Sequence, residues 1–128
     1  AITGAKIPNN AAEDSYNILS ALLGQDTKPI RSYTLHQTIS LAMAIRRGPW
    51  KYLDHKGSGG NNYGREGRWG MKQYALPEKT PNAPGQLYNL ENDPGETTKL
   101  YFDHPKIVKE LIGKLEEFKK TGRSAPKL

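Results

Sequence analysis

The clearest pattern in the sequence is a run of apolar residues near the C-terminus that recurs at helical spacing. Lys and Glu occupy most of the positions between them, so one face of the segment is apolar and the other is charged. Pro105 suits the first helical position, with Asp103 or His104 as the cap, and Gly122 suits the end. We therefore predict an amphipathic helix over residues 104–121. Its apolar stripe consists of Ile107, Val108, Leu111, Ile112, Leu115 and Phe118.

Four segments before this helix show the alternation, or the β-branched and aromatic content, that is typical of strands. In one of them Leu41, Met43 and Ile45 alternate with two alanines. Short links join the first three segments, which predicts a three-strand antiparallel meander over residues 30–54. A further short strand is predicted at residues 86–90. The strands of the meander are expected at residues 30–37, 40–47 and 50–54.

The rest of the chain is predicted to hold a linker, a short helix and a long loop. Residues 1–10 are small and polar, which is typical of a linker. Residues 11–24 predict a short helix with Asp14 or Ser15 as its cap. Residues 55–85 are rich in Gly and Pro and keep no period, so we expect a long loop there. The apolar face of the short helix would consist of Ile18, Leu19, Leu22 and Leu23.

Together these elements predict one domain of the α+β class over residues 1–128. About four strands would form a small antiparallel sheet, and the C-terminal amphipathic helix would pack on one of its faces. A sheet of this size needs such a helix to bury its apolar side.

The composition narrows the chemistry that the chain can carry. It contains no cysteine, which excludes a disulfide framework, a thiolate zinc site and a cysteine nucleophile. No apolar run approaches the length of about 18 residues that a membrane span needs. The sequence starts at Ala1 without an initiator Met or a signal-peptide pattern, so we expect it to belong to a longer chain.

An excess of basic residues gives the chain a formal net charge of +6. This charge fits either an ordinary solvated surface or attraction to a polyanion such as nucleic acid, anionic lipid or sulfated glycan. Residues 61–70 mix Gly, Arg and aromatic side chains, as in some single-strand binders. No RNP-type motif is present, so nucleic acid is the less favoured partner. The alternative hypothesis for the chain is a standalone basic module that binds nucleic acid or sulfated glycan.

Side chains that would carry catalysis are few. His36, His55 and His104 have no metal-ligand spacing, and the chain has neither a Gly-x-Ser-x-Gly nucleophile elbow nor a Walker loop. The Gly-rich residues 57–60 lack the Lys-Ser/Thr ending and the following helix of a phosphate loop. The sequence therefore predicts no catalytic residue and no metal site in this chain.

Five short motifs follow one another along the chain in a specific order. They are Leu-His-Gln-Thr-Ile at 35–39, Met-Ala-Ile-Arg-Arg-Gly-Pro-Trp-Lys-Tyr at 43–52, Gly-Ser-Gly-Gly at 57–60, Gly-Gln-Leu-Tyr-Asn-Leu at 85–90 and Asp-Pro-Gly-Glu-Thr at 93–97. Lys6-Ile7-Pro8, Glu13-Asp14-Ser15-Tyr16 and a segment from Leu19 that ends in Leu-Leu-Gly precede them. The order and spacing of all these pieces, over residues 6–123, resemble the C-terminal subdomain of bacterial arylsulfatase-family sulfatases, which are type I, formylglycine-dependent enzymes. Lys99 stands where that family usually has Asn.

The resemblance implies a parent enzyme that hydrolyses sulfate esters, in particular those of a sulfated sugar. Such enzymes use a formylglycine, made within a Cys/Ser-x-Pro/Ala-x-Arg motif, and a calcium ion held by carboxylates. That motif is absent here. The resemblance therefore implies that this chain is inactive alone and packs on an N-terminal catalytic domain that supplies the formylglycine and the calcium. It also implies a periplasmic or secreted location.

The resemblance also suggests substrate-binding residues, because the family's C-terminal subdomain borders the active-site cleft. His36 and Gln37 end a predicted strand, and Ser58 lies in the Gly-rich loop. Arg46 and Arg47 are placed to meet an anionic substrate, and one of the two fits a solvated charge of the hairpin equally well. We expect His36, Gln37, Arg46 and Ser58 to lie at the rim of the cleft and to contact sulfated carbohydrate.

Overall fold

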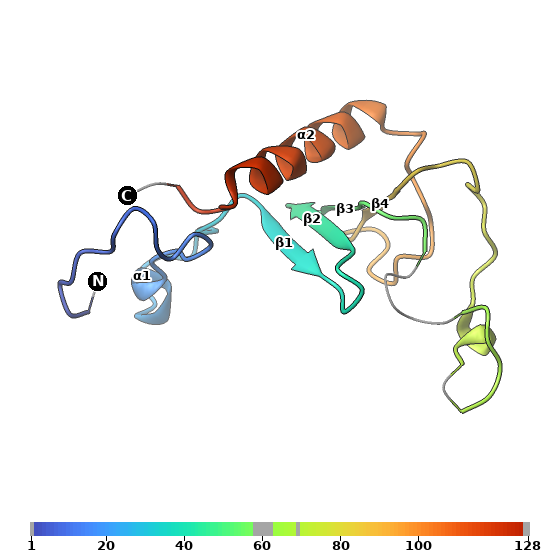
Figure 1. The fold of residues 1–128 in the computed structure, drawn as a ribbon, viewed down its shortest axis with the longest axis horizontal. Coiled ribbons are helices and arrows are strands. Elements are labelled where there is room, and N and C mark those ends of the chain that lie inside the picture. The colour runs from blue at the N-terminus through green and yellow to red at the C-terminus, as the bar shows by residue number, and fades with distance from the viewer. Residues whose placement is uncertain (1, 58–62, 69, 127–128) are drawn as a thin grey trace.

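The computed structural model describes residues 2–57, 63–68 and 70–126 and shows an α+β fold (Figure 1). Four strands form one antiparallel sheet in the order β1-β2-β3-β4, and the long helix α2 covers one face of it. The predicted fold class is therefore confirmed. The elements are α1 (Leu19–Leu22), β1 (Thr34–Gln37), β2 (Met43–Arg47), β3 (Trp50–Leu53), the 3₁₀ helix η1 (Lys72–Tyr74), β4 (Gln86–Asn89) and α2 (Pro105–Thr121).

The core lies between the sheet and α2. Strand pairing places Leu35 opposite Ile45, Ile45 opposite Tyr52, and Tyr52 opposite Leu87. Directly opposed residues of a pleated sheet share a face, so this row points to one side. There it meets the apolar stripe of α2, and Ile45, Tyr52 and Leu87 are buried. The helix contributes Val108, Leu111, Leu115 and Phe118 to the same core.

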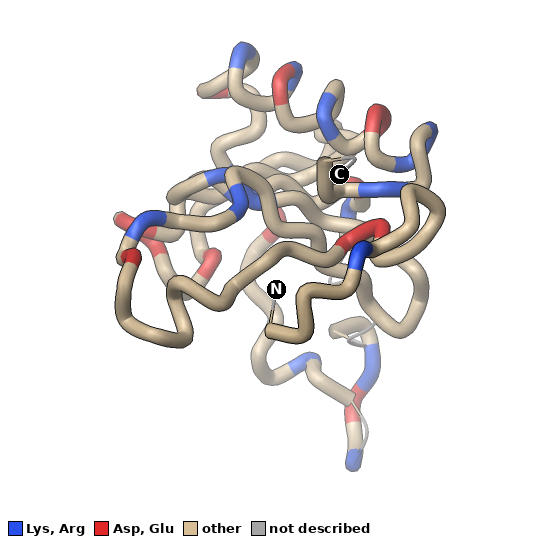
Figure 2. Tube along the Cα trace, turned by 90° about the vertical axis from the view of Figure 1, so that its left-hand side faces the viewer, with Lys and Arg blue, Asp and Glu red and all other residues tan. Residues whose placement is uncertain are grey.

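Helix α2 begins and ends where the sequence predicts, to within one residue. Pro105 occupies the first turn, after His104 as the N-cap residue. Gly122 ends the helix in the left-handed conformation, with φ of 64°, and its N–H donates to the Phe118 carbonyl. A residue with a Cβ resists this conformation, so glycine is the favoured choice there. Basic and acidic residues are interspersed along the helix on its exposed side (Figure 2).

The helix predicted over residues 11–24 is wrong in its extent. Only α1, a single turn, is helical, and Ile18 is its N-cap residue without any side-chain cap. Asp14 instead accepts hydrogen bonds from the backbone N–H and the hydroxyl of Ser124. The expected apolar face finds no core, because Leu22 is 70% exposed. A helix this short gains too little without packing to extend further.

The first two predicted strands are also shorter than expected. Residues 30–33 lie outside β1, and residues 40–42 lie outside β2. Leu41 was predicted to alternate within the second strand, but it sits in the turn between β1 and β2 with φ of 63°. Two hydrogen bonds close that turn, from Thr38 N–H to the Ala42 carbonyl and from Leu41 N–H to the Thr38 carbonyl. This turn chemistry ends the strand pairing earlier than the apolar alternation indicates.

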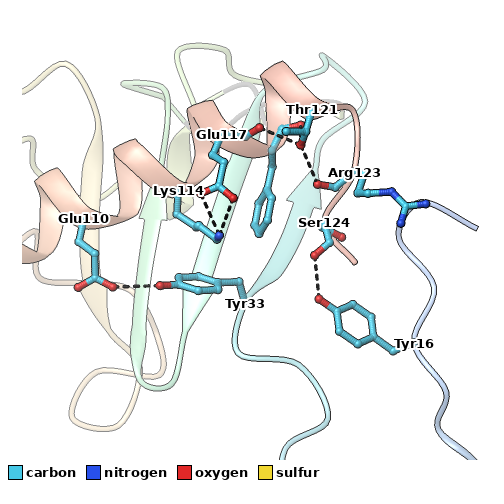
Figure 3. Close-up of polar contacts among 9 residues, drawn as sticks. Tyr16, Tyr33, Glu110, Lys114, Glu117, Thr121, Arg123 and Ser124 are labelled. Carbon is cyan, nitrogen blue, oxygen red and sulfur yellow. Dashed lines mark hydrogen bonds and ion pairs between the residues drawn. The ribbon is translucent and has the colours of Figure 1, made fainter. Parts of the chain in front are cut away.

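The N-terminal segment is tied to the residues that follow α2 (Figure 3). The Tyr16 hydroxyl donates to the Ser124 carbonyl at 2.8 Å, and the Ala125 N–H donates to the Glu13 carbonyl at 2.9 Å. Arg123 donates to the carbonyl of Ala11 at 3.2 Å. The polar segment before α1 is thus held by backbone and side-chain hydrogen bonds, whereas burial of apolar residues holds the sheet against α2.

Candidate functional site

The face of the sheet opposite α2 forms a cleft of about 600 Å³. Pairing places His36 opposite Ala44, Ala44 opposite Leu53, and Leu53 opposite Gln86. This row alternates with the core row, so it points away from α2. Two segments far along the chain, residues 74–79 and 94–99, complete the walls. The cleft therefore joins strands of the sheet to two loops that sequence order separates.

Gln86 and Tyr88 form the floor of the cleft. The Gln86 amide nitrogen donates to the carbonyls of His55, at 3.0 Å, and Gly57, at 2.8 Å. Its amide oxygen accepts a hydrogen bond from the Tyr88 hydroxyl at 2.7 Å. Desolvation, followed by the nearby negative charge of Glu96, raises the pKa of Tyr88 to about 12. The buried amide of Gln86 therefore fixes the start of the long loop, and Tyr88 keeps its proton at neutral pH.

Two ion pairs stand in the walls of the cleft. The Lys51 ammonium lies 2.6 Å from a carboxylate oxygen of Glu96, and Lys99 is paired with Glu78. Hydrogen bonding to Lys99 is the main cause that lowers the pKa of Glu78. Both carboxylates neutralise a cation that would otherwise face the cleft. Lys56 and Lys79 also line the cleft without an ion pair to any described carboxylate, so the walls present both paired charges and further cations.

The loop that carries Glu96 is shaped by local hydrogen bonds. Asp93 accepts bonds from the Thr97 hydroxyl at 3.0 Å and from the Thr98 N–H at 2.8 Å. Backbone hydrogen bonds from Thr97 and Thr98 lower the pKa of Asp93. Within this loop Glu96 adopts φ of 55°, which is uncommon for a residue with a side chain. The loop around Asp93 thus places Glu96 beside Lys51.

His36 lines the cleft close to this polar wall. Desolvation lowers the pKa of its imidazole, the positive charges of Lys51 and Arg46 lower it further, and Glu96 opposes them. His36 is therefore neutral at physiological pH. A neutral imidazole has one N–H donor and one acceptor nitrogen, which suits hydrogen bonding to a hydroxyl group.

The structure brings together two of the four predicted site residues. His36 and Gln37 are both among the residues that line the cleft, but Gln37 alternates with His36 and pairs with Met43, so its side chain is directed to the α2 side of the sheet. Arg46 shares the outer face of the sheet, but its Nε donates to the Gly48 carbonyl at 2.8 Å, and it is not part of the lining. Arg47 points to the other face and pairs with Glu110 of α2, so the expectation that it meets substrate is not supported by its position. Ser58 lies outside the described residues.

Sequence reasoning missed Lys51, Gln86, Tyr88 and Glu96 as members of this site. A signal for Lys51 was present, because it alternates along the strand with the aromatic residues Trp50 and Tyr52, which suit the core face. Trp50 is indeed half-buried against the core, where its ring lies 4.7 Å from that of His104. The positions of Gln86 and Glu96 depend on strand register and loop closure, which local pattern does not encode.

Neither a metal centre nor a membrane span was found in the part of the chain that the structure describes. No group of three or more His, Asp or Glu side chains there is arranged to hold a metal ion. No helix among those residues is long and apolar enough to cross a membrane. The family resemblance places the calcium in the catalytic part of the enzyme, and the described residues of this chain offer no such set of carboxylate ligands. Calcium and formylglycine remain predictions about the catalytic part of a sulfatase.

Comparisons with known proteins show what the chain is similar to. N-acetylgalactosamine-6-O-sulfatase of Bacteroides thetaiotaomicron is 32% identical over 113 residues, which is 88% of this chain and 20% of that relative. A solved sulfatase structure, from work on the metabolism of multiple glycosaminoglycans by the same organism, superposes with a TM-score of 0.67. It is 32% identical, and the match covers 90% of this chain and 22% of that one.

No protein-family model matches the chain. The chain spans about a fifth of the length of the curated relative, and the match falls in the relative's C-terminal part. The sequence similarity, the superposed fold and the order of the motifs agree. The chain is thus related to the sulfatases, as a counterpart of their C-terminal part.

Proposed function

We propose that this chain is the C-terminal subdomain of an enzyme that hydrolyses the sulfate esters of a sugar. The observation that supports this most is the 32% identity to an N-acetylgalactosamine-6-O-sulfatase over 88% of the chain. The chain lacks the Cys/Ser-x-Pro/Ala-x-Arg motif from which formylglycine is made. In this proposal it is inactive alone, and the catalytic domain supplies formylglycine and calcium. A periplasmic or secreted location is part of the same proposal.

The cleft on the outer face of the sheet would take the sugar of the substrate. Its lining combines the neutral imidazole of His36 with tyrosine rings such as that of Tyr74. Sites for small molecules typically combine apolar walls with a few polar groups that fix orientation. Sugar hydroxyls both donate and accept hydrogen bonds, so they match these groups.

The cleft offers a neutral group for the hydroxyls of a sugar beside its charged lysines. Lys51 and Lys99 are already paired with Glu96 and Glu78. A third group, His36, is neutral at physiological pH because its pKa is lowered. Lys56 and Lys79 also line the cleft, and an anion reaches them without displacing a carboxylate. A hydroxyl group can bond to the imidazole of His36 without breaking an ion pair.

The proposal can be tested on the complete open reading frame that encodes this chain. We expect the full-length protein to release sulfate from N-acetylgalactosamine 6-sulfate or a related sulfated sugar. The 128-residue chain alone should release none. If the full-length protein releases no sulfate from a panel of sulfated sugars, the proposal fails.

A variant of His36 tests the role of the cleft. His36→Ala in the full-length enzyme should lower kcat/KM about tenfold, since one hydrogen bond to a substrate is worth about 1 kcal/mol or somewhat more. Lys106→Ala is the control, because Lys106 is exposed on α2, on the other side of the sheet. An unchanged kcat/KM for His36→Ala would remove His36 from the sugar-binding side.

A further inference from the structure

The turn between β1 and β2, residues 38–42, presents two bare apolar side chains. Ile39 is 96% exposed and Leu41 is 72% exposed. Of the large hydrophobic residues that the structure describes, Ile39 is the most exposed. The turn protrudes from the end of the sheet (Figure 1). Scattered exposed hydrophobic residues are ordinary, but two within three residues of a protruding turn form a compact exposed apolar patch.

Hydrogen bonds hold this turn in one conformation. The Thr38 N–H donates to the Ala42 carbonyl at 2.9 Å, and the Leu41 N–H donates to the Thr38 carbonyl at 2.9 Å. The Thr38 hydroxyl oxygen also accepts a bond from the Ala42 N–H at 3.2 Å and lies 2.9 Å from the Ser40 hydroxyl. Apolar side chains on an ordered turn lose little conformational freedom when a partner covers them.

The backbone conformation of Leu41 carries a cost in conformational free energy. Its φ of 63° is left-handed, which disfavours a residue with a Cβ by roughly 1–2 kcal/mol. Its side chain is nevertheless exposed and gains little from burial. Strained residues persist where the surrounding structure or a function maintains them. Strain and apolar exposure therefore coincide at the same turn.

We propose that the turn at residues 38–42 docks into the catalytic part of the sulfatase, with Ile39 and Leu41 as the buried contacts. This inference rests on the function proposed above. The length of the curated relative indicates which partner covers this turn. The match covers 20% of that enzyme, so about four-fifths of it has no counterpart in this chain. Thr38 and Ala42 also line the cleft, so docking at this turn places the catalytic part at the end of the cleft.

Replacing the most exposed of the two side chains tests the docking. Ile39→Ser should leave the melting temperature of the 128-residue chain unchanged, because Ile39 is bare there. In the full-length protein the same change should lower the melting temperature by about 2 °C or more, since it removes a buried side chain. Ile2→Ser is the matched control, because Ile2 is 83% exposed. It should leave both proteins unchanged.

Two results would overturn the assignment to this turn. One is an unchanged melting temperature for full-length Ile39→Ser, and the other is an equal decrease for Ile2→Ser. Either result leaves the function proposal standing if the wild-type full-length protein still releases sulfate. Conversely, a full-length protein that releases no sulfate contradicts the function proposal, whatever the Ile39 variant does.

A photo-crosslinking side chain at position 39 identifies the occupant. In the full-length protein, benzoylphenylalanine in place of Ile39 should form an intramolecular cross-link to a peptide that precedes Ala1 of this chain. Mass spectrometry of the digested product locates that peptide. Cross-linked dimers, the absence of any cross-link, or cross-links only to neighbouring residues of the turn would contradict docking on the catalytic part.

Discussion

Leu41, Ala12 and Glu96 all adopt positive φ, although each carries a Cβ. For Glu96 the surrounding hydrogen bonds of Asp93 maintain the conformation, and the result is the ion pair with Lys51. For Leu41 the turn is closed by hydrogen bonds, yet the side chain itself contacts little. At the scale of single residues, the positive φ of Glu96 therefore serves an ion pair, whereas that of Leu41 serves no contact of its side chain.

Glycine at position 41 should stabilise the 128-residue chain. Leu41→Gly relieves the left-handed strain, which is partly offset by the greater freedom of glycine in the unfolded chain. We expect a net gain of about 0.5–1 kcal/mol in the free energy of unfolding, measured by chemical denaturation. Leu76→Gly is the control, because Leu76 is an exposed leucine without positive φ, and it should give no gain. Equal effects of the two changes would show that Leu41 is not strained.

At the scale of elements, α2 is the part of the fold that apolar period determines most directly. Four of its stripe residues are buried, and the end at Gly122 is set by a left-handed cap. Gly113 interrupts an otherwise favourable helical sequence on the exposed side. A Cβ built there meets no atom within 4 Å, so neither close approach nor positive φ requires glycine at this position.

Gly113→Ala should therefore stabilise α2. Alanine is favoured over glycine within a helix by about 0.5–1 kcal/mol, and the free energy of unfolding should rise by that amount. Gly85→Ala gives the opposite expectation, because its Cβ would lie 2.7 Å from the Leu53 carbonyl oxygen. Chemical denaturation of both variants measures the two signs. A loss of stability in Gly113→Ala would contradict this expectation.

At the scale of the whole molecule, two different kinds of interaction hold the parts together. Apolar burial holds the sheet on α2, whereas hydrogen bonds attach the N-terminal segment to residues 123–125 (Figure 3). Tyr16 donates to Ser124 and also lies under the guanidinium of Arg31, 4.9 Å from the ring centre. Hydrogen bonds at the surface contribute little each, so this attachment should open more easily than the core.

The double variant Asp14→Ala, Tyr16→Phe tests this attachment. It removes the side-chain bonds to Ser124 and should increase the rate of trypsin cleavage after Arg31 severalfold. The melting temperature of the core should change little. Asn17→Ala is the control, because Asn17 bonds only within its own segment, to the Leu19 N–H. An unchanged cleavage rate in the double variant would show that other contacts hold the segment.

The sequence predicted most of the fold and only part of the candidate site. The stripe of α2 and the apolar alternation of Met43 and Ile45 are local patterns, so they were readable without coordinates. His36 and Gln37 were found through a family motif, and both are among the residues that line the cleft. Gln86 and Glu96 were missed, because a residue enters this site only when distant segments close around the sheet.

The sequence by itself determined which segments become strands and helix, since their apolar periods require one buried face each. Its ordered motifs also determined the relation to sulfatases. Only the tertiary structure decided that α1 is a single turn, that Leu41 leaves the strand, and that Lys51 and Glu96 meet in the cleft. The physical reason is that the periodicity of buried positions is a property of one segment. Register, loop closure and turn strain depend on atoms from segments far apart in the chain.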